Sequence, residues 1–262
     1  MSSAKTKLAV VLGDPVAHSR SPEMFTRAFA AAKLDAVYLA WQVGARDFAG
    51  TTRALAALPA LGASVTVPHK QRAAQVADTL GEEAHATGVS NCLSFHDGEI
   101  YGDNTDVAGI VATLRALRIK RGAVVVVGAG GAARAAVYGL RMAGLEDIHV
   151  VNRTHARAKA LTRALGGEAH PWQAHEKLLG EAALVIHATS SQVRGEGMPF
   201  AVARLHARAI FFDLTYGDTP LMRAAHAHGL KAVDGSTMLV AQAERAFELW
   251  TGKKPPRGSM RL

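Results

Sequence analysis

Residues 124–133 read VVVVGAGGAA, and a helix-like pattern follows them. The run of β-branched residues predicts a buried strand, and the glycines predict a tight turn from that strand into the helix. Gly128 permits the turn, Gly130 lets the backbone approach a pyrophosphate closely, and Ala133 stands where a small residue lets the helix pack on the strand. We therefore expect a dinucleotide phosphate at the N–H groups of the helix start, the alternative being an ordinary glycine-rich turn.

The end of the next expected strand bears on the choice of dinucleotide. It reads Val151-Asn152-Arg153-Thr154, with Arg157 three residues further on. An acidic residue here would bind the 2′-hydroxyl of NAD, whereas a guanidinium and a hydroxyl suit the 2′-phosphate of NADP. The pattern therefore favours NADP. The alternative is that Arg153 is a surface residue and Thr154 caps the helix that follows.

Apolar runs alternate with helix-like segments along the whole chain, which predicts an α/β fold. We expect βαβ units that build mostly parallel, doubly wound sheets, with helices covering both faces. The charge balance changes near residue 105 and a new βαβ series starts there, so we place a domain boundary at that point. The expected strands are residues 8–12, 37–41, 64–67, 123–127, 148–151, 184–187 and 210–214, and the expected helices are residues 24–32, 70–79, 107–117, 132–143 and 156–165.

The composition excludes several classes of protein. The chain has 262 residues, of which 49% are hydrophobic and 20% are charged, so it can bury a full core and does not have the composition of a disordered protein. No apolar run approaches the roughly 18 residues that a membrane span requires, and the apolar stretch near the N-terminus is too short for a secretory signal. Cys92 is the single cysteine, which excludes an intramolecular disulfide and makes the cytoplasm the expected compartment.

The formal charge and the histidines raise the question of nucleic-acid and metal partners. Residues 1–105 carry a net charge of −1 and residues 106–262 carry +9, so the excess is confined to one part of the chain. Aromatic residues make up 6% of the chain, too few for a platform that stacks on single-stranded nucleic acid. A solvated basic surface or a small anionic ligand explains the charge better, and we expect no nucleic-acid partner. The 12 histidines fall into no metal-ligand spacing, so we expect no metal site.

Four clusters of polar side chains stand at expected strand ends and loop starts in the first part of the chain. Each has an ordinary structural interpretation. Ser21 caps a helix with Pro22 at its first position, and Pro68 ends a strand. Asp106 caps the next helix, and Lys70 is a solvated lysine at a helix start. The clusters are residues 18–22, 64–70, 90–91 and 104–106.

Taken together, these clusters and the glycine-rich turn form an ordered set of motifs. Gly-x-Pro-x-x-His-Ser-x-Ser-Pro is found at residues 13–22, and Val-Thr-x-Pro-x-Lys at residues 65–70. Asp-Gly followed by Gly-x-Asn-Thr-Asp is found at residues 97–106, Gly-Ala-Gly-Gly-Ala at residues 128–132, Asn-Arg-Thr-x-x-Arg at residues 152–157, and a closing helix at residues 238–252. In type, order and coverage of nearly the whole chain, the set resembles the shikimate dehydrogenase family.

The resemblance implies a two-domain α/β enzyme with its active site in the cleft between the domains. A substrate domain would comprise residues 1–105 and 238–262, and an NADP-binding Rossmann domain residues 106–237. The enzyme would interconvert shikimate and 3-dehydroshikimate, with Lys70 and Asp106 as the catalytic pair. The implied substrate-binding residues are Ser19, Ser21, Ser64, Thr66, Asn91, Tyr216 and Gln242, and the implied cofactor-binding residues are Gly128, Ala129, Gly130, Gly131, Ala132, Asn152, Arg153, Thr154, Arg157, Thr189, Leu214 and Gly235.

These residue types suit the oxidation of a ring alcohol. Removal of a hydride needs a proton acceptor at the hydroxyl. A lysine can be this acceptor when a neighbouring aspartate orients it and stabilises its charged form. In the reverse direction the ammonium protonates the developing alkoxide. Hydroxyl-bearing side chains suit a small polyhydroxylated acid, which an apolar pocket cannot discriminate. We expect this substrate as the main partner of a monomer or a homodimer.

Three positions depart from the family pattern on the substrate or nicotinamide side. Ser64 replaces the Asn before Val-Thr, His187 replaces the Asn of an Asn-Ala-Thr-Ser segment, and Thr237 replaces the second glycine of Asp-Gly-x-Gly-Met. These changes leave open a paralogue that acts on quinate, an amino-substituted shikimate or another hydroxy acid. A non-catalytic dinucleotide sensor is a further alternative, although the presence of both Lys70 and Asp106 argues against it.

Overall fold

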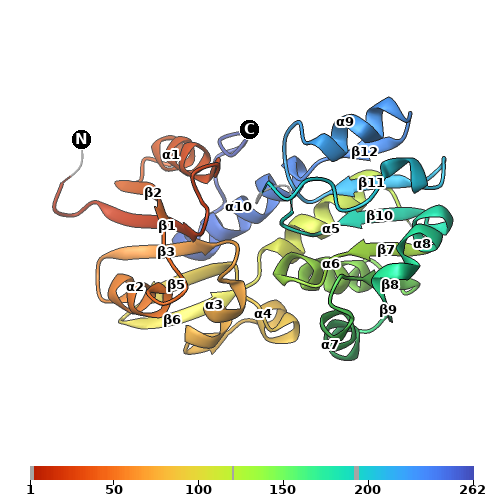
Figure 1. The fold of residues 1–262 in the computed structure, drawn as a ribbon. Helices are drawn as coiled ribbons and strands as arrows, with labels where there is room; N and C mark the ends of the chain where they lie inside the picture. Colours follow the sequence, from red (N-terminus) through yellow and green to blue (C-terminus); the bar gives the residue numbers. More distant parts are fainter. Residues whose placement is uncertain (1–2, 120, 192–194) are drawn as a thin grey trace. The chain divides into compact units, whose positions relative to one another are not determined.

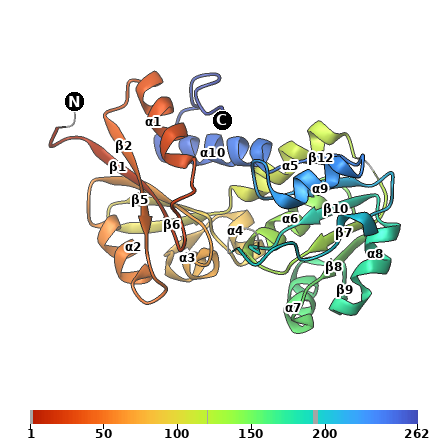
Figure 2. The same cartoon turned by 45° about the horizontal axis from the view of Figure 1, so that its top comes forward.

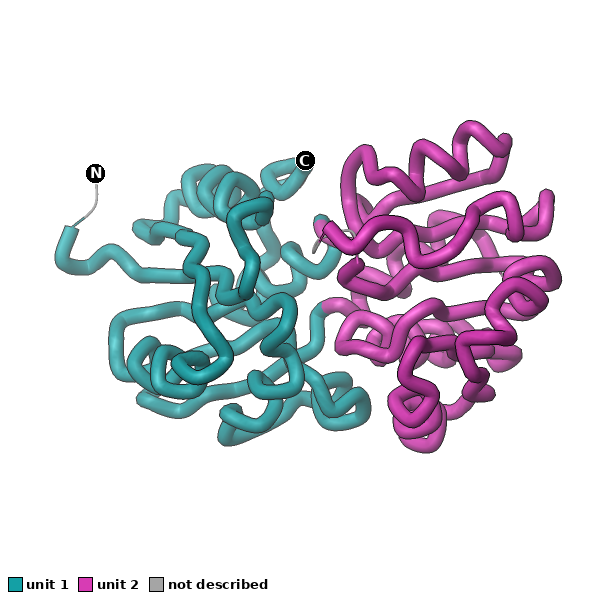
Figure 3. Tube along the Cα trace, viewed as in Figure 1, with its two compact units in different colours: residues 1–105, 240–262 teal, residues 106–239 magenta. Residues whose placement is uncertain are grey.

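The valine run at Val124–Val127 forms a fully buried strand, as its composition predicts. The computed structural model describes residues 3–119, 121–191 and 195–262. Contacts divide the chain into two units, one of Met1–Thr105 with Val240–Leu262 and one of Asp106–Leu239 (Figure 3). In sequence, the second unit is therefore inserted into the first.

The first unit is built on one sheet. Its described strands are β1 (Lys7–Gly13), β2 (Ala36–Gln42), β3 (Ala60–Val65), β4 (Thr79–Leu80), β5 (Cys92–His96) and β6 (Glu99–Asp103), and its helices are α1 (Ser21–Ala31), α2 (Phe48–Ala56), α3 (Lys70–Val76) and α4 (Glu82–Thr87). The strand order is β2-β1-β3-β5-β6-β4. β1 is parallel to β2 and β3, β4 is parallel to β6, and β5 is antiparallel to both of its neighbours.

The antiparallel strand β5 belongs to a hairpin that the sequence analysis did not predict. β5 and β6 are joined by Asp97 and Gly98, whose φ values of 51° and 82° are both positive. A two-residue turn with positive φ at both positions matches the right-handed twist of a hairpin, and Asp-Gly is a preferred sequence for it. The Asp-Gly pair flanked by alternating apolar residues would therefore have predicted this hairpin from the sequence.

Two layers of side chains cover the sheet of the first unit. Val10 and Leu12 of β1 point to a core shared with Phe48 and Leu55 of α2. Figure 1 shows α1 and the C-terminal part of α10 (Ser236–Thr251) over the other face, with α2 and α3 opposite. On the α1 side, aromatic rings pack together, Phe25 lying 4.4 Å from Tyr38 and 5.1 Å from Trp250 between ring centroids.

The second unit is an all-parallel sheet with helices on both faces. Its described strands are β7 (Val124–Val127), β8 (Ile148–Val151), β9 (Glu168–His170), β10 (Leu184–His187), β11 (Ile210–Asp213) and β12 (Lys231–Val233). Its helices are α5 (Asp106–Leu117), α6 (Gly131–Met142), α7 (His155–Leu165), α8 (His175–Glu181) and α9 (Pro220–Ala227), with short 3-10 turns η1 (Trp172–Ala174) and η2 (Val202–Arg204). The strand order β9-β8-β7-β10-β11-β12 is the 3-2-1-4-5-6 order of a Rossmann fold, so the α/β prediction is confirmed.

Strand β7 shows how this sheet is buried. Val124 and Val126 face a core that includes Leu140 of α6 and Leu161 of α7. Val125 and Val127, which point the other way, lie in a second core with side chains of α8, α9 and β11. Because both faces are covered, the strand carries apolar residues at every position rather than alternating with polar ones. Figure 2 shows the two helical layers of this unit from a second direction.

Several expected boundaries differ from those of the structure. Ser21 is the first residue of α1 and not its cap, because Arg20 occupies the N-cap position. The strand expected at residues 64–67 starts earlier, at Ala60, and ends at Val65. The helix expected at residues 70–79 ends at Val76, because Thr79 already belongs to β4.

The division between the units falls inside α10. Residues up to Leu239 belong to the second unit, whereas the sequence boundary was placed before Met238. Met238 packs directly on Gly109 of α5, where an added Cβ would lie 2.7 Å from the Met238 side chain. This contact explains why the first turn of α10 belongs with the second unit. Within the described residues, no helix is both long and apolar enough to cross a membrane.

Candidate functional site

The carboxyl ends of β7 and β10 meet at the point where the strand order of the second unit reverses. Gly128 follows β7 and has a φ of +122°, a conformation that L side chains rarely adopt. A Cβ at Gly128 would lie 2.8 Å from the carbonyl oxygen of Ala188 and 3.2 Å from Thr189, which follow β10. Glycine is thus required here, and it brings the predicted residue Thr189 beside the turn. Ligands of open parallel sheets bind at such a reversal point.

Helix α6 begins directly after this turn. Gly130 occupies its N-cap position without a side chain, and a Cβ there would meet none of the described residues within 4 Å. Gly131 and Ala132 form the first turn of the helix, and both are only half buried. The N–H groups of the first turn and the helix dipole favour an anion at this end. The predicted residues Gly128, Ala129, Gly130, Gly131 and Ala132 therefore lie together around an accessible helix start.

The residues that favour NADP lie in the turn after β8, the neighbour of β7. Asn152 donates from Nδ2 to the carbonyl oxygen of Thr154 at 3.0 Å, which orders the turn. The Arg153 side chain is 77% exposed and forms an ion pair with Glu196 at 3.1 Å. Thr154 occupies the N-cap position of α7, but its side chain makes no capping hydrogen bond. Arg157 is exposed in the first turn of α7, so this turn presents two exposed guanidinium side chains.

The loop after β11 brings two further predicted residues together. Gly235 packs on Leu214 so closely that a Cβ at Gly235 would overlap the Leu214 carbonyl oxygen, and the Gly235 N–H donates to the oxygen of Thr215 at 3.1 Å. The half-buried Tyr216 follows in the same loop. Asp234 fixes the loop by accepting a hydrogen bond from the N–H of Gly217 at 2.7 Å.

A fully buried pair links the ends of β10 and β11. His187 Nδ1 lies 2.9 Å from Oδ1 of Asp213, and neither side chain is exposed to solvent. The other ring nitrogen of His187 lies 2.6 Å from the Thr189 hydroxyl, which in turn lies 2.9 Å from the Ser191 hydroxyl. Burial alone would raise the pKa of Asp213, but the hydrogen bond and charge interaction with His187 lower it below its usual value. His187 thus holds Thr189 in place beside Gly128.

The predicted substrate residues of the first unit gather at the carboxyl edge of β1 and β3. Thr66 follows β3, and its N–H donates to the oxygen of Leu12 in β1 at 2.9 Å. Ser64 is buried in β3 and accepts a hydrogen bond of 2.8 Å from the hydroxyl of Tyr38. The Tyr38 hydroxyl also interacts with Ser21, and burial raises the pKa of Tyr38. The Ser19 hydroxyl accepts from the N–H of Ser21 at 3.3 Å.

A second polar group lies at the start of β5. Asn91 is buried, and its amide oxygen accepts from the N–H of Thr105 at 2.7 Å while its Nδ2 donates to the Thr105 hydroxyl at 3.0 Å. The Thr105 hydroxyl lies 3.4 Å from Oε1 of Gln242 in α10. Ser64 of β3 pairs with Cys92 of β5, so Asn91 stands beside the end of β3. The fold therefore brings Ser64, Thr66, Asn91 and Gln242 to one edge.

The two predicted catalytic residues occupy matching positions in their own units. Lys70 is the first residue of α3 and half buried, and its backbone oxygen accepts from the N–H of Ser90 at 2.9 Å. Asp106 is the first residue of α5 and 4% exposed, and it follows directly after Thr105. Lys70 belongs to the first unit and Asp106 to the second.

Three residues of these networks were missed by sequence reasoning. Tyr38 lies within an apolar strand pattern, and nothing in that pattern distinguishes it from a core residue. Asp213 lies within the expected strand at residues 210–214 and is the last residue of β11. An acidic residue at the end of an apolar strand could have drawn attention to it. Thr105 was part of a cited motif, but its role as the link between Asn91 and Gln242 depends on a contact across 137 residues.

Comparisons with known proteins agree on one family. Residues 11–93 match the model of the shikimate dehydrogenase substrate binding domain, residues 111–220 the shikimate / quinate 5-dehydrogenase model, and residues 235–261 the shikimate 5′-dehydrogenase C-terminal domain. The shikimate dehydrogenase (NADP(+)) of Mesorhizobium japonicum is 42% identical over 95% of this chain and 92% of its own. That of Acidiphilium cryptum is 39% identical over 97% and 93%.

Solved structures give the same result. Shikimate 5-dehydrogenase from Thermus thermophilus, in complex with NADP(H) and shikimate, has a TM-score of 0.86 at 35% identity and covers 97% of both chains. Shikimate dehydrogenase from Aquifex aeolicus has a TM-score of 0.91 at 31% identity, covering 99% of this chain and 98% of its own. Since curated relatives above 30% identity span nearly the whole chain, the chain belongs to the shikimate dehydrogenase family.

Proposed function

We propose that this chain is an NADP-dependent oxidoreductase that interconverts shikimate and 3-dehydroshikimate. The observation that carries the proposal is the close relationship to the Thermus thermophilus enzyme, whose structure holds NADP(H) and shikimate together. Each unit of this chain supplies one half of what that pair of ligands requires. The second unit has a glycine turn at an accessible helix start with cationic neighbours, and the first has an edge of hydroxyl and amide side chains.

The residues of the second unit fit NADP. Among the described residues, none would contact a Cβ at Gly130 at the start of α6, so we propose that a pyrophosphate approaches the backbone N–H groups there. We propose that Arg153, Thr154 and Arg157 hold the 2′-phosphate, with Asn152 ordering their turn. Thr189, Leu214 and Gly235 would line the nicotinamide part. When bound, NADP supplies the acceptor for a hydride, and NADPH the donor.

Arg153 is expected to exchange its present partner for the 2′-phosphate when the nucleotide binds. Its present partner Glu196 is an exposed carboxylate, and such surface ion pairs contribute about 0–1 kcal/mol. A phosphate that accepts charge-assisted hydrogen bonds from the same guanidinium contributes about 1.5–3 kcal/mol. The exchange therefore favours the nucleotide.

We assign the proton transfer to Lys70 with Asp106, on the strength of the motif match. In the oxidation, Lys70 would take the proton of the reacting hydroxyl, and in the reduction it would return that proton to the alkoxide. The carboxylate of Asp106 would orient the lysine and balance its charge. Asp106 is buried and is the first residue of α5, so its backbone position is set by the helix.

The substrate contacts follow from the edge of the first unit. We propose that Ser19, Ser21 and Thr66 receive the carboxylate and hydroxyls together with Ser64 and Asn91. Tyr38 already donates to Ser64, so the Ser64 hydroxyl is left to donate its own proton. Gln242 and Tyr216 would complete the substrate set. Cys92 is buried and forms no disulfide, which is compatible with the cytoplasm, the compartment that we propose.

The test is reduction of NADP by the purified protein with shikimate, beside quinate, NAD and a Lys70→Ala variant. Turnover with shikimate and NADP that is lost in Lys70→Ala supports reaction, cofactor and residue together. Turnover with quinate or another hydroxy acid, but not with shikimate, would change the assigned substrate and leave the assigned reaction, an NADP-dependent alcohol oxidation, unchanged. NADP binding without turnover on any such acid would instead identify a dinucleotide sensor.

A further inference from the structure

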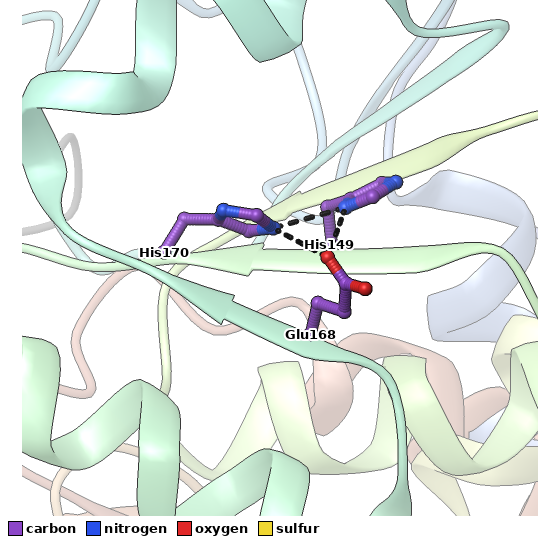
Figure 4. Close-up of side chains that lie close together, drawn as sticks. All are labelled: His149, Glu168 and His170. Atoms are coloured by element: carbon purple, nitrogen blue, oxygen red, sulfur yellow. Dashed lines mark hydrogen bonds and ion pairs between the residues drawn. The ribbon is translucent and has the colours of Figure 1, made fainter.

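Three potential metal ligands gather at the outer edge of the second unit's sheet. Figure 4 shows the side chains of His149, Glu168 and His170 turned toward one another. None of them belongs to the cofactor turn, and the expectation of no metal site rested on spacing along the sequence. Here the ligands come from two strands that are 17 residues apart in sequence, so sequence spacing does not reveal them.

Strand register explains why the three meet. His149 of β8 pairs directly with Glu168 of β9. His170 lies two residues further along β9, so it points to the same face as Glu168. β9 has three residues and a single neighbour, which places the cluster at the sheet edge and open to solvent. The Glu168 side chain is 72% exposed, and those of His149 and His170 are 20% and 23% exposed.

The donor atoms lie close to the spacing of a metal site, on either side of it. Nδ1 of His149 lies 3.0 Å from Nε2 of His170, and Oε2 of Glu168 lies 3.8 Å from the first and 3.6 Å from the second. Ligand atoms of a tetrahedral zinc ion, each about 2.0–2.2 Å from the metal, lie about 3.3–3.6 Å apart. The point equidistant from the three atoms in their own plane lies about 2.0 Å from each of them, so an ion displaced slightly from that plane toward a fourth ligand is at about 2.1 Å.

A further carboxylate orients the first ligand. Nε2 of His149 lies 3.0 Å from Oδ1 of Asp147, and a carboxylate can only accept, so Nε2 carries the proton. Nδ1 of His149 then presents its lone pair to the cluster. A metal-binding histidine almost always donates its other N–H in this way.

We propose that His149, Glu168 and His170 bind one divalent transition-metal ion of the zinc class. Two imidazoles and a carboxylate are a donor set that zinc favours over calcium or magnesium, with water in the remaining position. The ion joins β9 to β8 at a sheet edge whose pairing is only three residues long. Its effect is therefore on the stability of the second unit, and the proposal does not depend on the identity of the substrate.

The experiment is calorimetric titration of untagged, chelator-treated protein with ZnCl₂. We expect one ion per chain, an affinity reduced at least 100-fold in His149→Gln and in His170→Gln, and one reduced about 10-fold in Asp147→Asn. Saturating zinc is expected to raise Tm by roughly 5–10 °C in the parent protein and not in the two histidine variants. The matched control is His226→Gln/His228→Gln, which removes two exposed histidines of the same unit and leaves binding unchanged.

A second measurement keeps the proposal testable if a variant folds poorly. Co²⁺ added to the parent protein is expected to give the intense visible absorption of a four-coordinate site, displaced by one equivalent of Zn²⁺. Binding no tighter than in the His149→Gln variant, equal loss in the His226/His228 control, or a six-coordinate Co²⁺ spectrum would each overturn the assignment.

Discussion

The buried carboxylate of Asp213 allows a prediction whose size follows from its contacts. Asp213 accepts hydrogen bonds from Nδ1 of His187 at 2.9 Å, from the hydroxyl of Thr219 at 2.9 Å and from the N–H of Thr215 at 3.0 Å. Its side chain is completely buried, as is that of His187. Replacement by alanine leaves these donors without their acceptor, and His187 and Thr219 are both buried.

The expected loss in the free energy of unfolding comes from each donor that is left without its acceptor. A buried donor that loses its acceptor costs about 1–3 kcal/mol. Thr215 is only half buried, so we expect the donors of the buried His187 and Thr219 to dominate the loss. Asp213→Ala is therefore expected to destabilise the folded state by about 3–5 kcal/mol, a large part of the 5–15 kcal/mol of a typical domain. Asp213→Asn keeps one acceptor oxygen and is expected to lose about 1–2 kcal/mol.

The assay is equilibrium unfolding in urea, followed by circular dichroism. The matched control is Asp218→Asn, because Asp218 lies five residues away but its side chain is 74% exposed in a surface ion pair with Arg223. That variant is expected to change stability by less than 1 kcal/mol. If Asp213→Ala lost no more than Asp218→Asn, the buried network would not stabilise the second unit and the reasoning would be wrong.

Three further outcomes are expected. Because the pKa of Asp213 is lowered on folding, its contribution to stability is present above the ordinary carboxyl pKa and is lost as pH falls through the lowered value. When the free energy of unfolding is measured against pH, it is therefore expected to fall less steeply at acid pH in Asp213→Asn than in the parent protein. Tyr38→Phe removes the donor to Ser64, and urea unfolding is expected to show a loss of about 0.5–1.5 kcal/mol. Gly62→Ala places a Cβ against the Trp250 indole, and thermal unfolding is expected to show a loss of at least about 1–3 kcal/mol, with Gly50→Ala, which has open space, as its control.

The sequence predicted the second unit better than the first, for a physical reason. Runs such as Val124–Val127 are buried on both faces, so they are apolar throughout and their turns carry glycine. The first unit adds β5 and β6, whose pairing depends on an Asp-Gly turn, and β4, which has only two residues. Short strands bury too little to leave an apolar pattern.

Some site residues could be predicted from the sequence and others could not. Gly128 was recognisable because its conformation and its close neighbour both demand glycine. The roles of Thr105 and Asp213 depend on partners brought close only by the fold, and the same is true of the His149 cluster. Local motifs show which residues stand at strand ends, whereas register and long-range packing decide which of them meet.

The insertion of one unit within the other also fixes an order of events during synthesis. Residues 1–105 leave the ribosome first, yet their core needs Phe247, which lies 5.7 Å from Phe29 between ring centroids, and Trp250, which donates to the Leu93 oxygen at 3.0 Å. At 5–20 residues per second these partners arrive roughly 7–30 s after Thr105. The second unit is complete before them, at Leu239. The part of the chain that is made first is thus the last to close its core, and a nascent or truncated chain that stops before α10 ends exposes the apolar face beneath α1.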